Sequence, residues 1–570
     1  MLMALLVGAG AGVGSIIFRW CIQTFTRWFS GHDDYASAPG SDNPHVSWLG
    51  PFFVLIVPVV GGLLYGPLVN RFAKEARGHG VPEVILAVAQ RGGRISPKVA
   101  VVKTLASALT IGSGGSVGRE GPIVQIGSAL GSTLGRFAKL TEPRVKLLVA
   151  CGAAGGIAAT FNAPLAGVIF ALELILATFT AEAFGATVLA SVTASVIGRA
   201  AFGDTAFLSL PDFPVQHIAQ YGLFALLGLI AGAVGVLFSR VLYAIEDACD
   251  WAWRGPEWLR PAVGGLALGL VLLALPEMYG VGYPVLEGAT EGRYAIGFLL
   301  LLLVGKMVAT SLTIGIGGSG GVFAPSLFIG AMVGAAFGAE AHSLLPGTAG
   351  AVGAYALVGM GAVFAGAARA PITAVVILFE LTGEYSIILP LMLAIVLATA
   401  TSRVLTRDTI YTLKLRRRGI DVDGPAAGAR IGSQSVASVM EPLPTPLPAS
   451  LSLPDAADLL SRSSHGALPV RDASGAYLGI ATARAVAEAL AEQPSGAPAV
   501  AGDLVESVPR VTIDEQLAVA LNALIAAPGT GLAVLDPDRE ELVGWLSHQG
   551  ALRALHASEG EPTPALLASS

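Results

Sequence analysis

Two glycine-rich segments of this chain carry polar residues at matched positions. Residues 103–122 read KTLASALTIGSGGSVGREGP, and residues 306–325 read KMVATSLTIGIGGSGGVFAP. The offset is 203 residues throughout, and from Thr110 and Thr313 onward eight of thirteen positions are identical. Each segment ends in a proline followed by an apolar run, which is typical of the start of a helix. We therefore expect two equivalent loops, each leading into a helix.

The start of such a helix can bind an anion. The N–H groups of the first turn lack partners within the helix, and the helix dipole adds positive charge there. Glu120 lies at the first of these starts, so its carboxylate could take the place of an anion until it is protonated or displaced. An ion pair with Arg119 is the alternative, although adjacent helical residues point in different directions. For the loops themselves, the alternative is close packing of helices through small residues.

A second repeat follows each loop. NAPLAGVIFALEL at 162–174 parallels RAPITAVVILFEL at 369–381 with an offset of 207 residues. Two related halves, each interrupted by a glycine-rich loop at corresponding positions, are typical of transporters whose binding site lies between the repeats at mid-membrane. We expect the halves to span about residues 1–203 and 204–418.

The composition indicates that most of the chain lies in a membrane. Of its 570 residues, 54% are hydrophobic and 13% are charged, and the mean hydropathy is +0.69; a soluble domain has about 25% charged residues. Apolar runs, including 145–179 and 351–381, recur up to about residue 403. Several runs are shorter than the roughly 20 residues that span a bilayer. We expect an all-α, multi-span protein built from two inverted repeats with broken helices.

Basic residues predict the orientation. Segments 71–98, 136–146 and 414–418 are rich in Lys and Arg, whereas 31–47 and 203–217 carry Asp and no Lys or Arg. Because cytosolic loops are enriched in positive charge, we expect the first group of segments to face the cytosol. The plasma (inner) membrane is the expected location.

Several classes of function are not favoured. The net charge is −6 with no basic stripe, so nucleic acid is not expected as a partner. The cysteines Cys21, Cys151 and Cys249 have no metal-ligand spacing, and we expect neither a metal nor another cofactor. GSGGSVGRE lacks the Gly-Lys-Ser/Thr of a phosphate-binding loop, and no catalytic constellation argues for an enzyme.

A cation transporter is the alternative from another class. It would use membrane glutamates such as Glu120, Glu173 and Glu380 as ligands, with the C-terminal tail as a sensor. Such a site needs clustered carboxylates or rings of carbonyl groups. These glutamates stand singly in the sequence, so anion transport is favoured.

The C-terminal part has a different composition. Residues 419–432 form a polar linker, residues 433–492 and 499–558 share an order of strand, helix, strand, turn and strand, and residues 559–570 form a tail. This duplicated α/β pattern resembles a tandem of CBS domains. CBS pairs that bind adenosine nucleotides usually place Asp after Thr/Ser-x-x. At the matching positions this chain has Ala485, three residues after Thr482, and Gly550, three residues after Ser547. The absence of Asp at these two positions gives little support to nucleotide binding.

Residues 1–418 resemble the CLC family of chloride channels and chloride/proton antiporters. The resemblance rests on GREGP at 118–122, GGVFAP at 320–325, GHGVPE at 78–83, close to the family's GSGIPE, and Tyr411 after the final apolar run. It implies a homodimer in the membrane with a separate path for chloride or a similar anion in each subunit. A tandem of CBS domains also occurs in that family.

The resemblance carries roles onto individual residues. Glu120 resembles the gating glutamate, and Lys103 resembles a buried lysine that raises the positive potential of the path. Residues matching the anion-binding positions are His79, Gly80, Arg119, Gly121, Val322, Phe323 and Tyr411. Plainer roles remain open for three of these residues: packing for Phe323, an interfacial aromatic for Tyr411, and a snorkelling lysine for Lys103.

Two departures from the family concern proton coupling and selectivity. His79 stands where the family has a serine hydroxyl, and an imidazole can donate a hydrogen bond or carry a proton. Leu174 stands where coupled members often carry a glutamate. A proton would therefore need another relay, for which Glu173 and His79 are the candidates, and the sequence leaves channel and antiporter open.

Overall fold

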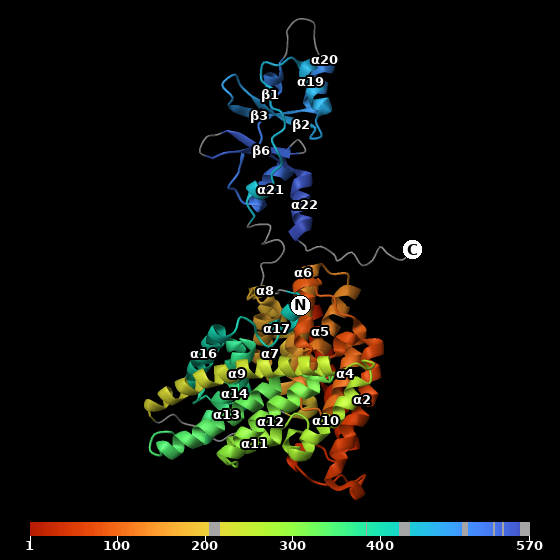
Figure 1. The fold of residues 1–570 in the computed structure, drawn as a ribbon, viewed down its shortest axis with the longest axis vertical. Helices are drawn as coiled ribbons and strands as arrows, with labels where there is room; N and C mark the ends of the chain where they lie inside the picture. Colours follow the sequence, from red (N-terminus) through yellow and green to blue (C-terminus); the bar gives the residue numbers. More distant parts are fainter. Residues whose placement is uncertain are drawn as a thin grey trace. The chain divides into compact units, whose positions relative to one another are not determined.

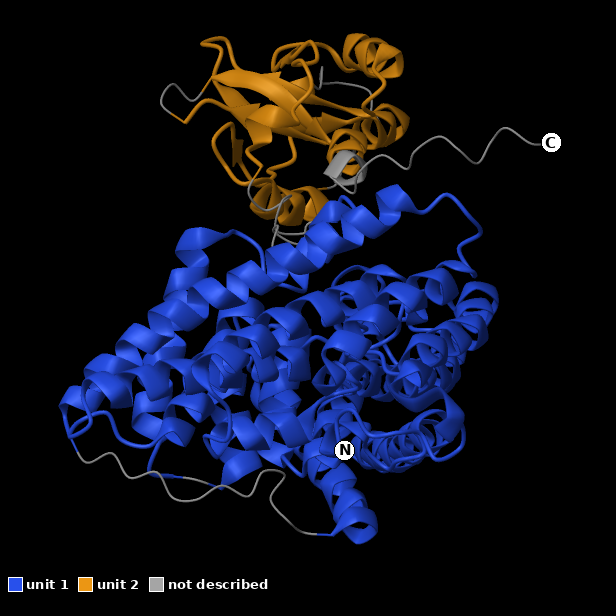
Figure 2. Cartoon of the chain, turned by 60° about the horizontal axis from the view of Figure 1, so that its bottom comes forward, with its two compact units in different colours: residues 1–421 blue, residues 422–570 orange. Residues whose placement is uncertain are grey.

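The computed structural model describes residues 1–203, 217–383, 385–420, 434–492, 500–527, 531–537 and 541–558. The chain divides into two compact units, residues 1–421 and 422–570, drawn in blue and orange in Figure 2. The linker predicted for 419–432 lies outside the described residues from 421 on, as do the tail at 559–570 and most of the acidic segment 203–217.

The regular secondary-structure elements described in the first unit are all helices, which run from red to teal in Figure 1. Eight helical stretches among the described residues are long and apolar enough to cross a membrane, and others are shorter, so the expected multi-span all-α architecture with short helices is confirmed. The α-helices are α1 (Leu2–Ser30), α2 (Phe53–Phe72), α3 (Val81–Gln90), α4 (Pro97–Gly112), α5 (Glu120–Phe137), α6 (Glu142–Phe161), α7 (Pro164–Phe170), α8 (Ala181–Phe202), α9 (Ala219–Ala252), α10 (Arg260–Ala274), α11 (Tyr283–Thr290), α12 (Ile296–Gly315), α13 (Phe323–Leu344), α14 (Val352–Ala368), α15 (Pro371–Thr382), α16 (Ile388–Leu405) and α17 (Thr412–Arg417).

Two long apolar runs are each divided into two helices, which the sequence analysis did not predict. The run 145–179 breaks between α6 and α7 at Asn162, and the run 351–381 breaks between α14 and α15 at Arg369. Both residues are left-handed, with φ of 56° and 54°, a conformation that ends a helix. Each is followed by Ala-Pro, and the proline opens the next helix.

The two glycine-rich loops form equivalent structures and bond to each other reciprocally. The Ser116 N–H donates to the Thr313 hydroxyl at 3.2 Å, and the Ser319 N–H donates to the Thr110 hydroxyl at 3.2 Å. Gly118 and Gly321 exchange N–H···O bonds of 2.8 and 2.6 Å as an antiparallel bridge. The expectation of two equivalent loops, each leading into a helix, is confirmed, since α5 and α13 begin 203 residues apart.

Glycines also allow close helix packing within each half. A Cβ on Gly127 of α5 would lie 2.1 Å from the Gly152 carbonyl oxygen of α6, and a Cβ on Gly152 would lie 2.0 Å from the Gly127 oxygen. In the second half, a Cβ on Gly330 of α13 would lie 2.3 Å from the Gly359 oxygen of α14. Small-residue packing, the alternative considered for the glycine-rich loops, therefore occurs beside them.

The second unit consists of two similar α/β modules, whose strands are drawn in blue in Figure 1. In each module, the first strand pairs parallel with the second, which pairs antiparallel with the third. The first module contains β1 (Leu447–Pro448), α19 (Leu453–Arg462), β2 (Ala467–Arg471), β3 (Tyr477–Thr482) and α20 (Ala483–Glu492); the second contains β4 (Val511–Thr512), α21 (Leu517–Ala526), β5 (Gly531–Leu535), β6 (Leu542–Ser547) and α22 (His548–Ser558). The predicted duplication of a small α/β module is thus confirmed.

The glycine contact between α5 and α6 can be tested by Gly127→Ala. The added methyl group would collide with backbone, so we expect a loss of about 1–3 kcal/mol of stability and a lower melting temperature of the purified protein in detergent. Gly297→Ala is the matched control, because a Cβ there meets nothing within 4 Å. Equal melting temperatures for the two variants would contradict the packing described here.

Candidate functional site

Three loops meet where α3, α5 and α13 begin. In addition to the bridge between Gly118 and Gly321, the GHGVPE loop bonds to the second glycine-rich loop. The Gly78 N–H donates to the Gly318 oxygen at 3.1 Å, and the Gly320 N–H donates to the Gly78 oxygen at 3.3 Å. Segments from three parts of the sequence therefore bring three helix N-termini together inside the first unit.

Glu120, the first residue of α5, lies within this junction. Its side chain is buried, with 1% of the residue exposed. One carboxylate oxygen accepts a hydrogen bond of 2.8 Å from the Tyr283 hydroxyl, and the other lies 3.4 Å from the Ala324 N–H at the start of α13. A Cβ on Gly118 would lie 2.1 Å from this second oxygen. The carboxylate thus occupies the N-terminal end of the opposite half's helix, in space that a side chain at residue 118 would fill.

Gly80 and Gly121 permit the close approach of the first two loops. A Cβ on Gly121 would lie 2.0 Å from the His79 carbonyl oxygen, and a Cβ on Gly80 would lie 2.7 Å from the Gly121 oxygen. Gly80 also has φ of 87°, which favours glycine. The predicted anion-binding positions His79, Gly80 and Gly121 therefore share one backbone junction with Glu120.

His79 is a buried polar side chain within this junction. It is 1% exposed, and neither ring nitrogen forms a hydrogen bond with a described residue. Lys103, Lys414 and Arg418 interact with it electrostatically. A ring N–H in a positively charged environment is suited to donating a hydrogen bond to a small anion.

Arg119 precedes α5 and lies among aromatic rings. Its guanidinium carbon lies 5.3 Å from the ring centre of Tyr283 and 5.9 Å from that of Phe161. The cation therefore lies beside the residue that donates to Glu120, and it also interacts electrostatically with the Glu120 carboxylate.

The positions of Val322, Phe323 and Tyr411 are compatible with the roles implied by the resemblance. Val322 caps α13, and Phe323 is its first residue, with its ring 4.5 Å from the Phe364 ring and 5.8 Å from the Phe161 ring. Phe323 therefore packs as an aromatic side chain while its backbone lies at the helix start. Tyr411 is 2% exposed, caps α17 and interacts electrostatically with Glu120.

Two buried lysines donate hydrogen bonds to the loops. The Lys103 ammonium donates to the carbonyl oxygens of Ala76 and Gly78 at 3.0 and 2.7 Å. Its repeat partner Lys306 donates to the oxygens of Gly280 and Val281 at 3.1 and 2.9 Å, and to the Ser116 hydroxyl at 2.9 Å. Each lysine thus fixes the loop before a short helix and adds positive charge near the junction.

Glu173, a candidate proton relay in the sequence analysis, is bound at the start of another helix. Its carboxylate accepts from the Ile372 N–H at 3.1 Å and from the N–H and hydroxyl of Thr373 at 2.8 and 2.7 Å. Its repeat partner Glu380 accepts from the N–H groups of Leu165 and Ala166 at 2.9 and 2.7 Å. These contacts give Glu173 a structural role in joining the halves, and its role as a proton relay remains a prediction.

Sequence reasoning missed Tyr283, the hydroxyl donor to Glu120. The signal was a third repeat, because GVGYP at 280–284 corresponds to GHGVP at 78–82 with an offset of 202 residues. Gly282 has φ of 89°, close to the 87° of Gly80. Tyr283 therefore occupies in the second half the position of Val81 in the first.

The second unit offers no acidic side chain at the two positions where nucleotide-binding CBS pairs carry Asp. The Thr482 hydroxyl donates to Glu506 at 3.0 Å, and the Ser547 hydroxyl donates to Glu441 at 2.9 Å. Each hydroxyl also accepts from the backbone N–H three residues later, at Ala485 and Gly550. Both hydroxyls are thus engaged within the unit. Across the described residues, no group of three or more His, Cys, Asp or Glu could hold a metal ion.

Comparisons with known proteins agree with this organisation. The voltage gated chloride channel family model matches residues 61–403, and the CBS domain model matches residues 436–492. A ClcB-like chloride channel protein of Ralstonia nicotianae is 35% identical over 73% of this chain and 96% of its own length. The H(+)/Cl(-) exchange transporter ClcA of Vibrio parahaemolyticus is also 35% identical, over 73% of this chain and 89% of its own.

A solved structure has the same fold in the first unit. A slow cyanobacterial Cl−/H+ antiporter is 28% identical, with a TM-score of 0.66, and the match covers 73% of this chain and 97% of that protein. The family model covers more than half of the chain, and the matched region contains both glycine-rich loops and Glu120. The chain is therefore an integral membrane protein of the voltage gated chloride channel (CLC) family, with C-terminal CBS domains.

Proposed function

We propose that this protein carries chloride or a similar small anion across the membrane, along a path through the junction of the three loops, with Glu120 as its gate. The observation that carries the proposal is the position of the Glu120 carboxylate, which accepts from the Tyr283 hydroxyl and lies at the Ala324 N–H. A carboxylate is itself an anion, so groups that hold it can hold chloride when it leaves.

The energetic requirement for such a path is severe. Moving a small ion from water into a low-dielectric interior costs tens of kcal/mol by idealised estimates, and partial charges from the protein must replace the lost hydration. Backbone N–H groups at helix starts supply these charges. The buried ammonium groups of Lys103 and Lys306 add positive potential without closing the path, since both donate to loop oxygens.

Gating follows from the chemistry of the carboxylate. When Glu120 is ionised, it competes with the anion for the same donors. Protonation removes its charge and weakens its hold on the Tyr283 hydroxyl and the Ala324 N–H, so an anion can replace it. Anion flux should therefore increase as the pH falls through the titration of Glu120.

Exchange of chloride for protons is the more specific mechanism that we propose to test. It is favoured by the relatives described as exchange transporters or antiporters. Leu174 cannot carry a proton, and Glu173 is bonded to the start of α15. A relay through an apolar interior needs an ionisable group or ordered water, and His79 is the candidate that lies at the junction.

The basic segments support a cytosolic position for one end of the first unit. Arg418 forms an ion pair with Glu83 at 2.7 Å, and a Cβ on Gly92 would lie 3.1 Å from the Glu142 carboxyl group. Segments 71–98, 136–146 and 414–418 therefore gather together, and positive charge favours the cytosolic side. We propose that the second unit is cytosolic and that the protein is a homodimer in the plasma membrane with one path in each subunit.

The gate can be tested with Glu120→Gln, which mimics a protonated carboxyl group. We expect chloride efflux from reconstituted vesicles to lose most of its pH dependence and to remain high at neutral pH. Tyr283→Phe removes one donor to the ionised carboxylate, worth about 1.5–3 kcal/mol, so the pH dependence of efflux should shift to higher pH by about one unit or more. Glu340→Gln, at an exposed position of α13, is the control. A Glu120→Gln variant with the wild-type pH profile would refute the gate.

Exchange can be tested by recording chloride and protons together. We expect a chloride gradient across vesicles to drive steady uphill proton movement through the wild-type protein. His79→Ala should retain chloride flux and lose the proton movement, whereas the exposed His342→Ala should retain both. Absence of proton movement in the wild type would indicate an uncoupled channel, and coupled movement in His79→Ala would exclude His79 as the relay.

A further inference from the structure

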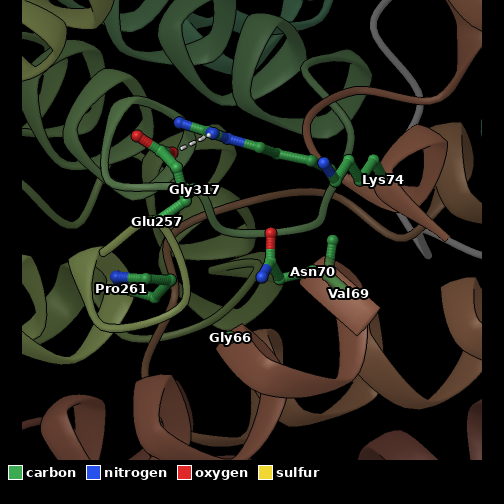
Figure 3. Close-up of a pocket in the computed structure, with 8 residues that line it drawn as sticks. Gly66, Val69, Asn70, Lys74, Glu257, Pro261 and Gly317 are labelled. Atoms are coloured by element: carbon green, nitrogen blue, oxygen red, sulfur yellow. Dashed lines mark hydrogen bonds and ion pairs between the residues drawn. The ribbon is translucent and has the colours of Figure 1, made fainter. Parts of the chain in front are cut away.

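A cavity outside the junction lies where α2 ends and α10 begins. It has a volume of about 120 Å³ and is lined by Gly66, Val69, Asn70, Lys74, Arg77, Glu257, Pro261 and Gly317. In Figure 3, Asn70 and Lys74 lie on one side of the cavity, and Glu257 and Pro261 lie on the other. The lining combines two cations, one carboxylate and one amide.

The charges of the lining favour an anionic ligand. Lys74 is exposed and forms no ion pair or side-chain hydrogen bond with any described residue. The Arg77 guanidinium pairs with Glu257 at 2.8 Å, and both side chains are partly exposed, at 36% and 53%. An exposed ion pair contributes little free energy, so an anion can compete with Glu257 for Arg77. Phosphate oxygens suit this donor set of ammonium, guanidinium and amide.

An apolar strip of α2 leads to the cavity. Ile56, Val60, Leu63 and Pro67 are exposed and recur at helical spacing on one face of α2, and the next position of that face is Asn70. On the other side, Trp258 is 41% exposed just before α10, and Trp is enriched where a membrane meets water. A ligand with both a charged headgroup and an apolar chain fits this continuous surface.

We propose that the cavity binds the phosphate headgroup of an anionic membrane lipid, with an acyl chain along Ile56, Val60 and Leu63. Basic pockets between membrane helices on the cytosolic side are suited to lipid headgroups. Free phosphate shares the headgroup chemistry but would leave the apolar strip unused. The lipid is therefore the ligand that accounts for both the charged lining and the apolar strip.

The position of the cavity also links it to the junction. Arg77 directly precedes Gly78, and Gly317 directly precedes Gly318, whose oxygen accepts the Gly78 N–H. A headgroup that competes with Glu257 for Arg77 acts at the base of the loop that carries His79. This effect on transport rests on the proposed function, whereas lipid binding does not.

Native mass spectrometry of the full chain in detergent, titrated with phosphatidylglycerol, measures the binding directly. Near an anionic lipid each Lys contributes about 1 kcal/mol, so we expect Lys74→Gln to bind about fivefold more weakly than wild type. Lys98→Gln, an exposed basic residue of the same segment outside the cavity, should bind as wild type does. Phosphatidylcholine should bind more weakly than phosphatidylglycerol.

Three results would overturn the lipid site. These are equal binding by Lys74→Gln and wild type, equal binding of phosphatidylcholine and phosphatidylglycerol, and full displacement of the lipid by inorganic phosphate at the same concentration, which would indicate a free-phosphate site.

In vesicles of phosphatidylcholine with and without phosphatidylglycerol, wild-type chloride flux should differ, and Lys74→Gln should lose the difference. Equal flux with intact binding would refute the link to the loop while leaving the lipid site standing.

Discussion

A small anion inside a membrane protein loses its hydration, which partial charges and hydrogen-bond donors of the protein must replace. In the proposed anion path, this constraint accounts for a junction of helix starts rather than helix sides. Backbone N–H groups at the start of α5, α13 and α3 are the donors available to such an anion. These N–H groups can converge only if the helices begin inside the unit and the loops before them approach closely. Short helices, glycine at Gly80 and Gly121, and two glycine-rich loops follow from that requirement.

Duplication supplies the geometry, and reciprocal bonds hold it. Thr110 and Thr313 each bond the loop of the other half, and Glu173 and Glu380 each bond the first turn of a helix in the other half. The twin lysines Lys103 and Lys306 fix the loops before α3 and α11. These polar groups, which a membrane interior would penalise, are therefore bonded across the halves, and in the proposed site the donors at Glu120 are positioned for a ligand.

The parts that sequence could predict are those repeated in it. The loops at 103–122 and 306–325, the all-α membrane unit and the duplicated tail follow from pattern and composition. The division of the run 145–179 at Asn162 was missed, because an Asn in an apolar run gives only a weak signal for a left-handed residue. The contact of Tyr283 with Glu120 joins residues 163 apart in the chain, and the role of Glu173 depends on a partner 199 residues away; neither partner can be read from local spacing.

The central claim is that the groups that hold the Glu120 carboxylate form an anion site. The most direct measurement is a crystal structure of Glu120→Gln grown in bromide, with anomalous scattering recorded at the bromine edge. The account predicts an anomalous peak within hydrogen-bonding reach of the Ala324 N–H and the Tyr283 hydroxyl, where the carboxylate lies in the structure described here. Bromide bound elsewhere in the first unit, with no peak at this junction, would contradict it.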